Sequence, residues 1–286
     1  MKYFAVIGHP VAHSRSPIIH QAFAKQFGHE ITYARLHAAP GGFADVLAAF
    51  QAAGGHGVNV TLPFKLDAYA ICSEVSDRAK SAAAVNTIAF SKRGLIGDNT
   101  DGLGLVDDLS GRLGLKLEGL SVLICGAGGA TRGVIAPLFE AGCRHIRVVN
   151  RDVQKAKQLC IDINNVPHHG ALDACSYSDL QTLKSGRGFD VLGFDVLINA
   201  TSAGLAGQRL DVPDVMFAKS RLAYDMVYAA KPTVFMEQAM QAGCADSSDG
   251  LGMLVGQAAH AYALWHGVMP QTAPVYKDLR AAIDGQ

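Results

Sequence analysis

Lys65 and Asp101 are the residues of this sequence whose types and surroundings most favour proton-transfer chemistry. Lys65 ends the segment NVTLPFK, in which an apolar strand over residues 58–61 stops before Pro63, because proline cannot donate to a sheet ladder. Asp101 lies in GDNTDG, after a second apolar run over residues 85–90. Loops at strand ends carry ligands in α/β folds, so the two side chains could act as a pair on one substrate hydroxyl. Taken singly, each is better explained as a solvated lysine or a turn aspartate.

The composition describes a globular chain of 286 residues, long enough for two domains with separate cores. Hydrophobic residues make up 49% and charged residues 17%, the opposite of a disordered balance. Its 25 basic and 25 acidic residues cancel without forming a basic run, which argues against nucleic-acid binding. The six cysteines form no CxxC pair, which indicates a reducing compartment, and the 11 histidines form no HExxH motif, so no metal site is expected. We find no signal-peptide core and no run of about 18 apolar residues, and we expect a cytoplasmic protein.

Strands and helices alternate along the first hundred residues, which predicts a largely parallel sheet with helices on both faces. The expected strands cover residues 3–7, 31–36, 58–61 and 85–90, and the expected helices cover residues 18–27, 43–50 and 69–72.

Ser14 and Ser16 precede the first expected helix. Ser16 stands directly before Pro17, which fits a helix N-cap followed by proline at the first helical position. Two hydroxyls beside a helix N-terminus also suit a bound carboxylate, and both interpretations can hold together. Asn86 is an amide inside an apolar run, and its partner is either the backbone or a ligand hydroxyl.

A strand over residues 120–125 leads into Gly126-Ala127-Gly128-Gly129-Ala130 and then a helix, the order that binds a dinucleotide pyrophosphate. The loop departs from GxGxxG, because Thr131 occupies the third glycine position. The next strand, residues 146–149, ends at Asn150-Arg151, where NAD-binding proteins commonly carry an acidic residue. An arginine there instead suits the 2′-phosphate of NADP.

The last third of the sequence contains three more apolar elements. Residues 196–204 are expected to form a strand with a small-residue loop suited to a nucleotide, and residues 222–227 are expected to be the last strand. The final expected element is a helix over residues 251–266. Gln257 on this helix is equally well explained as a satisfied core amide and as a substrate contact.

Nine motifs occur in a fixed order along nearly the whole chain: HSRSP, NVTLPFK, VNTI, GDNTDG, GAGGA, NR, NATSAG, DMVY and DGLGMLVGQ. In this the chain resembles the shikimate dehydrogenase family. The resemblance implies NADPH-dependent, reversible reduction of 3-dehydroshikimate to shikimate in the biosynthesis of chorismate and aromatic amino acids. It implies an α/β fold with two domains: a parallel-sheet substrate domain over residues 1–101, completed by C-terminal helices over residues 239–286, and a Rossmann-like NADP domain over residues 102–238. Whether the chain is a monomer or a homodimer stays open.

The resemblance also assigns site residues. It makes Lys65 and Asp101 the catalytic pair, without deciding which of them is the formal proton donor. The residues implied to line the substrate pocket are Ser14, Ser16, Thr61, Asn86, Tyr228 and Gln257. The residues implied to face NADP are Gly126, Ala127, Gly128, Gly129, Ala130, Asn150, Arg151, Lys155, Thr201, Met226 and Gly250.

Three features depart from the family pattern. Asp152 places an anion beside Arg151, and we interpret it as a helix N-cap rather than a cofactor ligand. Pro232 comes later after Tyr228 than is usual, and residues 188–195 look like a short insertion without an assigned function.

Two other functions stay open. A quinate/shikimate dehydrogenase of the same fold that also accepts NAD is favoured slightly by Asp152. A non-catalytic sensor of shikimate or quinate could dispense with Lys65 and Asp101, and the presence of both argues against it.

Overall fold

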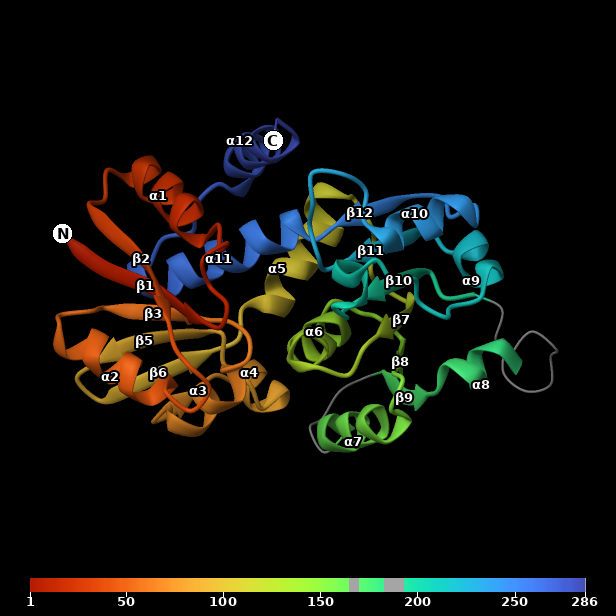
Figure 1. Cartoon of the computed structure of the whole chain (residues 1–286), viewed down its shortest axis with the longest axis horizontal. Helices are drawn as coiled ribbons and strands as arrows, with labels where there is room; N and C mark the ends of the chain where they lie inside the picture. The colour runs from red at the N-terminus through yellow and green to blue at the C-terminus, as the bar shows by residue number, and fades with distance from the viewer. Residues whose placement is uncertain (165–169, 183–192, 286) are drawn as a thin grey trace. The chain divides into compact units, whose positions relative to one another are not determined.

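The computed structural model describes residues 1–164, 170–182 and 193–285 (Figure 1). Its contacts divide the chain into two compact units, residues 1–108 with 253–279, and residues 109–252 with 280–286. The domain boundaries expected at 101 and 238 stay a prediction, because a compact set of contacts is not by itself an independently folding domain. No helix in the described part of the chain is long and apolar enough to cross a membrane.

The first unit is built on a six-stranded sheet. Its strands are β1 (Lys2–Gly8), β2 (Ile31–His37), β3 (Gly57–Val60), β4 (Glu74–Val75), β5 (Thr87–Ser91) and β6 (Gly94–Asp98). Its helices are α1 (Ser16–Phe27), α2 (Phe43–Ala52), α3 (Lys65–Ile71), α4 (Asp77–Ala82), α5 (Asp101–Asp107), most of α11 (Leu251–His266) and the first part of α12 (Thr272–Asp284). The strand order is β2-β1-β3-β5-β6-β4, and only β5 runs against its neighbours. The sheet is therefore largely parallel, as predicted.

Alternating side chains of β1 pack against helices on both faces of this sheet. Ala5 and Ile7 belong to a core shared with α2, α3 and α4, whereas Phe4 and Val6 belong to a second core that Trp265 of α11 covers. This follows from strand geometry, because successive side chains point to opposite faces.

The same alternation runs along β3. Val58 and Val60 join the core with α2, α3 and α4, so Asn59 between them points to the opposite face. There it hydrogen-bonds to Tyr33 of β2, a member of the second core.

The second unit contains a fully parallel sheet of order β12-β11-β10-β7-β8-β9. Its strands are β7 (Ser121–Cys125), β8 (His145–Val149), β9 (Ala171–Cys175), β10 (Val196–Asn199), β11 (Leu222–Asp225) and β12 (Ser247–Asp249). Its helices are α6 (Gly129–Glu140), α7 (Val153–Asn164), α8 (Tyr177–Thr182), α9 (Asp214–Lys219), α10 (Val234–Gln241) and the end of α12 (Thr272–Asp284), with the short helical turns Asp108–Arg112 and Ala203–Ala206. This is the strand order of a dinucleotide-binding fold, whose ligand lies where the order reverses, between β7 and β10. The predicted α/β fold class with a Rossmann-like second part is confirmed.

The C-terminal half differs from the sequence-based expectation at two elements. Residues 222–227 are not the last strand, because β11 ends at Asp225 and β12 follows; its polar sequence gives no strand signal, but pairing with β11 half-buries or buries it. The helix over 251–266 is not the final element, since α12 follows it. Residues 188–192 of the insertion and two of the 11 histidines, His168 and His169, lie outside the described residues.

Candidate active site

Lys65 is the first residue of α3, just beyond the end of β3. Phe64 before it is 1% exposed, so the turn between strand and helix is anchored in the core. The backbone carbonyl of Lys65 accepts a hydrogen bond from the N–H of Val85 at 2.9 Å. The backbone from which this ammonium extends is therefore held on both sides.

Asp101 is the first residue of α5 and is held by buried amides. Its N–H donates to Asn99 Oδ1 at 3.2 Å, and its Oδ1 accepts from Asn86 Nδ2 at 2.7 Å. Asn86 Nδ2 also donates to Thr100 Oγ1 at 3.0 Å, and Asn86 is 2% exposed. Asn86 Oδ1 accepts from the Thr100 backbone N–H at 2.9 Å, so the backbone partner expected from the sequence is present, together with side-chain partners in the same unit.

The two candidate catalytic side chains meet directly. Lys65 Nζ lies 2.5 Å from Asp101 Oδ2, and the side chains are 15% and 9% exposed. Partial burial strengthens the attraction between the charges, because fewer waters screen them. An ammonium has three N–H donors and Asp101 takes one, so this arrangement can present another to a substrate oxygen.

The N-cap role expected of Ser16 is wrong. Ser16 lies inside α1, Arg15 occupies the cap position, and no side chain caps this helix. Ser14 Oγ instead accepts from the Ser16 N–H at 3.3 Å and donates to Ser16 Oγ at 3.1 Å. A serine hydroxyl readily bonds the backbone two residues ahead, which accounts for the contact between Ser14 and the Ser16 N–H. The two hydroxyls lie together at the start of α1.

The other residues expected in the substrate pocket are placed as follows. Thr61 follows β3, and its N–H donates to the Ile7 carbonyl at 3.0 Å. Gln257 of α11 donates through Nε2 to the Leu254 carbonyl at 2.8 Å, so its amide is partly satisfied by its own helix. Tyr228 belongs to the second unit, in the segment after β11.

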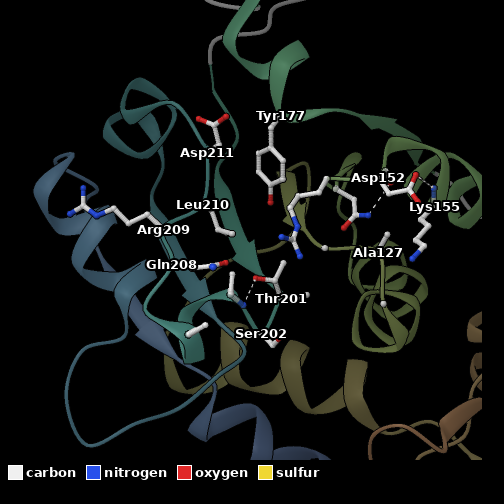
Figure 2. A pocket seen from close by; sticks show the side chains of 17 residues that line it. Ala127, Asp152, Lys155, Tyr177, Thr201, Ser202, Gln208, Arg209, Leu210 and Asp211 are labelled. Atoms are coloured by element: carbon white, nitrogen blue, oxygen red, sulfur yellow. Dashed lines mark hydrogen bonds between the residues drawn. The ribbon is translucent and has the colours of Figure 1, made fainter.

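A pocket of about 600 Å³ opens in the second unit at the carboxyl ends of β7, β8 and β10 (Figure 2). The expected cofactor residues that line it are Gly126, Ala127, Gly128, Asn150, Arg151, Lys155 and Thr201. Gly129, Ala130, Met226 and Gly250 are not among its lining residues.

The glycine loop after β7 is suited to close approach by a ligand. Gly126 has φ 110°, and a Cβ there would lie 2.9 Å from Thr201 Cγ2, so the position requires glycine. Thr131, in the place of the third motif glycine, donates to the Gly126 carbonyl at 2.8 Å and ties the loop to α6. Gly128 caps α6 without a side chain and the first turn contains no acidic residue, which leaves the helix N-terminus suited to an anion.

The N-cap interpretation of Asp152 is confirmed. Its Oδ1 accepts from the Gln154 N–H at 3.0 Å and from the Lys155 N–H at 3.4 Å, at the start of α7. Arg151 is exposed and forms no ion pair with an acidic side chain in the described ranges. The Asp152 carboxylate therefore faces backbone donors, and the Arg151 guanidinium keeps its charge for a ligand.

Sequence comparison identifies the family. Three family models match the chain: the shikimate dehydrogenase substrate binding domain over residues 6–88, shikimate / quinate 5-dehydrogenase over residues 109–207, and the shikimate 5′-dehydrogenase C-terminal domain over residues 250–280. A protein of Methylobacillus flagellatus named shikimate dehydrogenase (NADP(+)) is 47% identical over 285 residues, which cover 99% of this chain and 100% of the relative. This chain belongs to the shikimate dehydrogenase family.

Solved structures agree with this membership. An Ael1 enzyme from Pseudomonas putida matches with a TM-score of 0.88 and 36% identity, over 98% of both chains. Shikimate 5-dehydrogenase from Thermus thermophilus, solved in complex with NADP(H) and shikimate, matches with a TM-score of 0.83 and 33% identity, over 99% of this chain and 100% of that one. The family resemblance predicted from the motifs is confirmed.

The loop after β10 is held by a buried network. Thr201 donates through its backbone N–H and Oγ1 to Asn199 Oδ1, at 2.9 and 2.7 Å, and Asn199 Nδ2 donates to Asp225 Oδ1 at 3.0 Å. Burial raises the pKa of Asp225. The Met226 N–H donates to the Asn199 carbonyl, and a Cβ on Gly250 would lie 2.2 Å from the Met226 carbonyl oxygen. Gly250 therefore allows the Met226 backbone to approach closely, because a side chain at this position would clash with it.

The sequence analysis missed one wall of the pocket. Tyr177 of α8 lines it, together with residues 208–211. Figure 2 shows the Tyr177 hydroxyl directed toward the middle of the pocket, between Leu210 on one side and Asp152 on the other. Burial raises the pKa of Tyr177 well above its ordinary value, so the phenol stays protonated. These residues belong to no motif, and only the tertiary structure brings them to the pocket.

Proposed function

We propose that this protein catalyses the reversible, NADPH-dependent reduction of 3-dehydroshikimate to shikimate in aromatic amino acid biosynthesis. Its class as an oxidoreductase and NADP as its cofactor, both predicted from the sequence, are confirmed by the family and by the relatives' names. The observation that carries the proposal is the contact between Lys65 and Asp101 in the first unit.

The pair fits the proton requirement of this reaction. NADPH supplies a hydride to the ring carbonyl carbon, and the carbonyl oxygen must gain a proton as it becomes a hydroxyl. Lys65 would donate a hydrogen bond to that oxygen, stabilise the charge that develops on it and pass it a proton. Asp101 would hold the ammonium in place through the 2.5 Å contact.

Substrate recognition is assigned to side chains of the first unit. Ser14 and Ser16 would bind the substrate carboxylate, and Thr61 and Gln257 would line the pocket, while the role of Tyr228 stays a sequence-based prediction. Asn86 was expected beside the substrate, but both hydrogens of its amide are already engaged by Thr100 and Asp101. We therefore assign to Asn86 the orientation of Asp101.

The pocket of the second unit fits NADP. The loop of Gly126 to Ala130 and the N-terminus of α6 would bind the pyrophosphate, and Arg151 would bind the 2′-phosphate. Asn150, Lys155 and Thr201 would line the adenosine side, while Met226 and Gly250 are assigned to the nicotinamide side. The fit rests on the glycine at Gly126, where no Cβ has room, and on the free charge of Arg151.

The test uses purified protein, 3-dehydroshikimate and NADPH, with nicotinamide absorbance and product identification as readouts. We expect NADPH consumption in step with shikimate formation, and we expect the methyl ester of the substrate to be poorly used because its carboxylate is masked. Ligand binding without turnover would favour the sensor hypothesis. Equal use of ester and acid would contradict the assignment of the serines.

We also propose a cytoplasmic location. All six cysteines are free, and burial raises the pKa of Cys125 to about 12 and that of Cys143 to about 11. Buried thiols of this kind act as small apolar side chains and are stable in a reducing compartment.

A further inference from the structure

A line of buried side chains, joined by hydrogen bonds, crosses strands of the first unit's sheet and ends at Asp101. The links are Tyr33 Oη to Asn59 Oδ1 at 2.6 Å, Asn59 Nδ2 to Thr87 Oγ1 at 3.0 Å, Thr87 Oγ1 to Asn86 Oδ1 at 2.8 Å, and Asn86 Nδ2 to Asp101 Oδ1 at 2.7 Å. No member is more than 7% exposed. We call these five residues the Tyr33 chain.

The fold builds this chain from neighbouring strands. Asn59 of β3 lies opposite Thr87 of β5 in the sheet register, on the face turned away from the core with α2 to α4. Tyr33 reaches Asn59 from β2, across β1. The Tyr33 ring stacks on His20 with centroids 4.5 Å apart and an angle of 13° between the planes, which limits its rotation.

Two backbone groups fix the direction of every link. Asn59 Nδ2 also faces the Asn86 backbone carbonyl at 3.4 Å, and a carbonyl can only accept, so Asn59 must turn its Oδ1 to Tyr33. Asn86 Oδ1 accepts from the Thr100 backbone N–H at 2.9 Å, an obligate donor, so Asn86 must turn its Nδ2 to Asp101. Each side chain therefore donates to the next one along the line, and all donors point toward the carboxylate.

We propose that Tyr33, acting through Asn59 and Thr87, is a positioning residue for Asp101. This inference rests on the proposed function, in which Asp101 holds the Lys65 ammonium. Hydrogen bonds aligned in one direction polarise one another, so the first donor strengthens the last one. Without the phenol, Asn59 Oδ1 loses its 2.6 Å donor, and Asn59 and Thr87 rearrange. Asn86 then holds the carboxylate less firmly, and the ammonium loses its fixed position.

The first experiment compares Tyr33→Phe with Tyr262→Phe. Tyr262 is a matched control, because its buried phenol also makes a 2.6 Å hydrogen bond in the first unit, to His29 Nδ1, outside the Tyr33 chain. We expect kcat for shikimate oxidation to fall about 5–10-fold in Tyr33→Phe, the range for one lost hydrogen bond, with KM for NADP unchanged. Tyr262→Phe should stay within about twofold of wild type in kcat. Equal kcat in the two variants would overturn the inference.

A second pair of variants breaks the chain at its middle and guards against a folding defect in Tyr33→Phe. Thr87→Val removes the hydroxyl at nearly constant volume, and Thr87→Ser retains it. We expect Thr87→Val to lower kcat as Tyr33→Phe does and Thr87→Ser to keep most of the wild-type value. Valine as active as serine, or serine as impaired as valine, would show that the hydroxyl link has no part in catalysis.

The Tyr33 chain can be tested even if the proposed function is wrong. If wild-type protein does not oxidise shikimate, the chain is tested by urea unfolding of Tyr33→Phe, Asp101→Asn and the double variant. Shifts of the unfolding midpoint that do not add would support coupling along the chain, and additive shifts would contradict it.

Discussion

In the first unit, the Lys65–Asp101 pair is mostly buried, and other buried side chains hold it: Asn86 binds Asp101, and the Tyr33 chain leads to Asn86. In the second unit, Arg151 and Lys155 are exposed beside a pocket of about 600 Å³. The glycine loop that also lines this pocket offers backbone groups rather than side chains to a ligand. The first site fixes its charges by hydrogen bonds before any ligand arrives. The second fixes only its backbone and leaves its cations exposed to solvent.

This difference matches the two tasks. Proton transfer requires a donor within hydrogen-bond reach in a set direction, so a small displacement lowers the rate. A phosphate accepts hydrogen bonds from many directions, so an exposed guanidinium can find it after the cofactor binds. Substitutions should therefore affect kcat in the first unit and cofactor affinity in the second.

The largest effect is expected for Lys65→Ala. We expect kcat to fall by roughly 10²–10⁴-fold, the usual contribution of general acid–base catalysis, with NADP affinity nearly unchanged. Steady-state kinetics and NADPH titration by nicotinamide fluorescence measure the two separately. Near-normal turnover would show that Lys65 has no part in the mechanism. The expected difference between the two units, kcat in one and cofactor affinity in the other, would then be wrong.

The second effect concerns cofactor affinity. Arg151→Ala should raise KM for NADP about 10–200-fold, because a hydrogen bond to a charged group is worth about 1.5–3 kcal/mol, and should leave KM for NAD nearly unchanged. Arg221→Ala is a suitable control, because Arg221 is an exposed arginine of the same unit that does not line the pocket. Equal losses with both cofactors would contradict the 2′-phosphate assignment.

A third variant is expected to displace Asp101 by displacing α5, the helix that begins at Asp101. A Cβ on Gly104 of α5 would lie 2.3 Å from the Gln257 nitrogen and 2.7 Å from the Met253 carbonyl of α11. We expect Gly104→Ala to lower the free energy of unfolding by about 1–3 kcal/mol and to lower kcat as well. Gly111→Ala is the control, since nothing lies within 4 Å of a Cβ there. If both variants unfold at the same urea concentration, the close packing of α5 on α11 is unimportant.

The smallest effect is a pH dependence of stability. Burial, aided by the nearby charge of His266, lowers the pKa of His20 from 6.5 to about 3. Below pH 6.5 the unfolded chain binds a proton at His20 that the folded chain does not, so stability falls as pH falls, by at most about 1.4 kcal/mol per pH unit. Urea unfolding of wild type and His20→Gln at pH 7 and pH 5 measures the difference. Equal losses in both proteins would show that His20 does not contribute.

The functional motifs could be predicted from the sequence because each one carries its own local signal. NVTLPFK combines a strand, a proline and a lysine, and the loop after β7 lies between a strand and a helix. Asp152 could be interpreted as an N-cap from its position alone, and its bonds to Gln154 and Lys155 agree.

Contacts between distant segments could not be predicted. Ser-Pro spacing predicts an N-cap at Ser16, but α1 begins one residue earlier than expected, so Arg15 occupies the cap position and Ser16 is already helical. Tyr33 and Asn59 meet across β1, and no spacing in the sequence indicates that. β12 is recognisable only through its pairing with β11.

The most direct test of the account is kcat/KM of the wild-type protein for shikimate and quinate, each measured with NADP and with NAD. We expect shikimate with NADP to be the preferred combination, because Arg151 is free to bind the 2′-phosphate while Asp152 is engaged by the backbone. Equal kcat/KM with both cofactors would contradict this account and favour the quinate/shikimate enzyme.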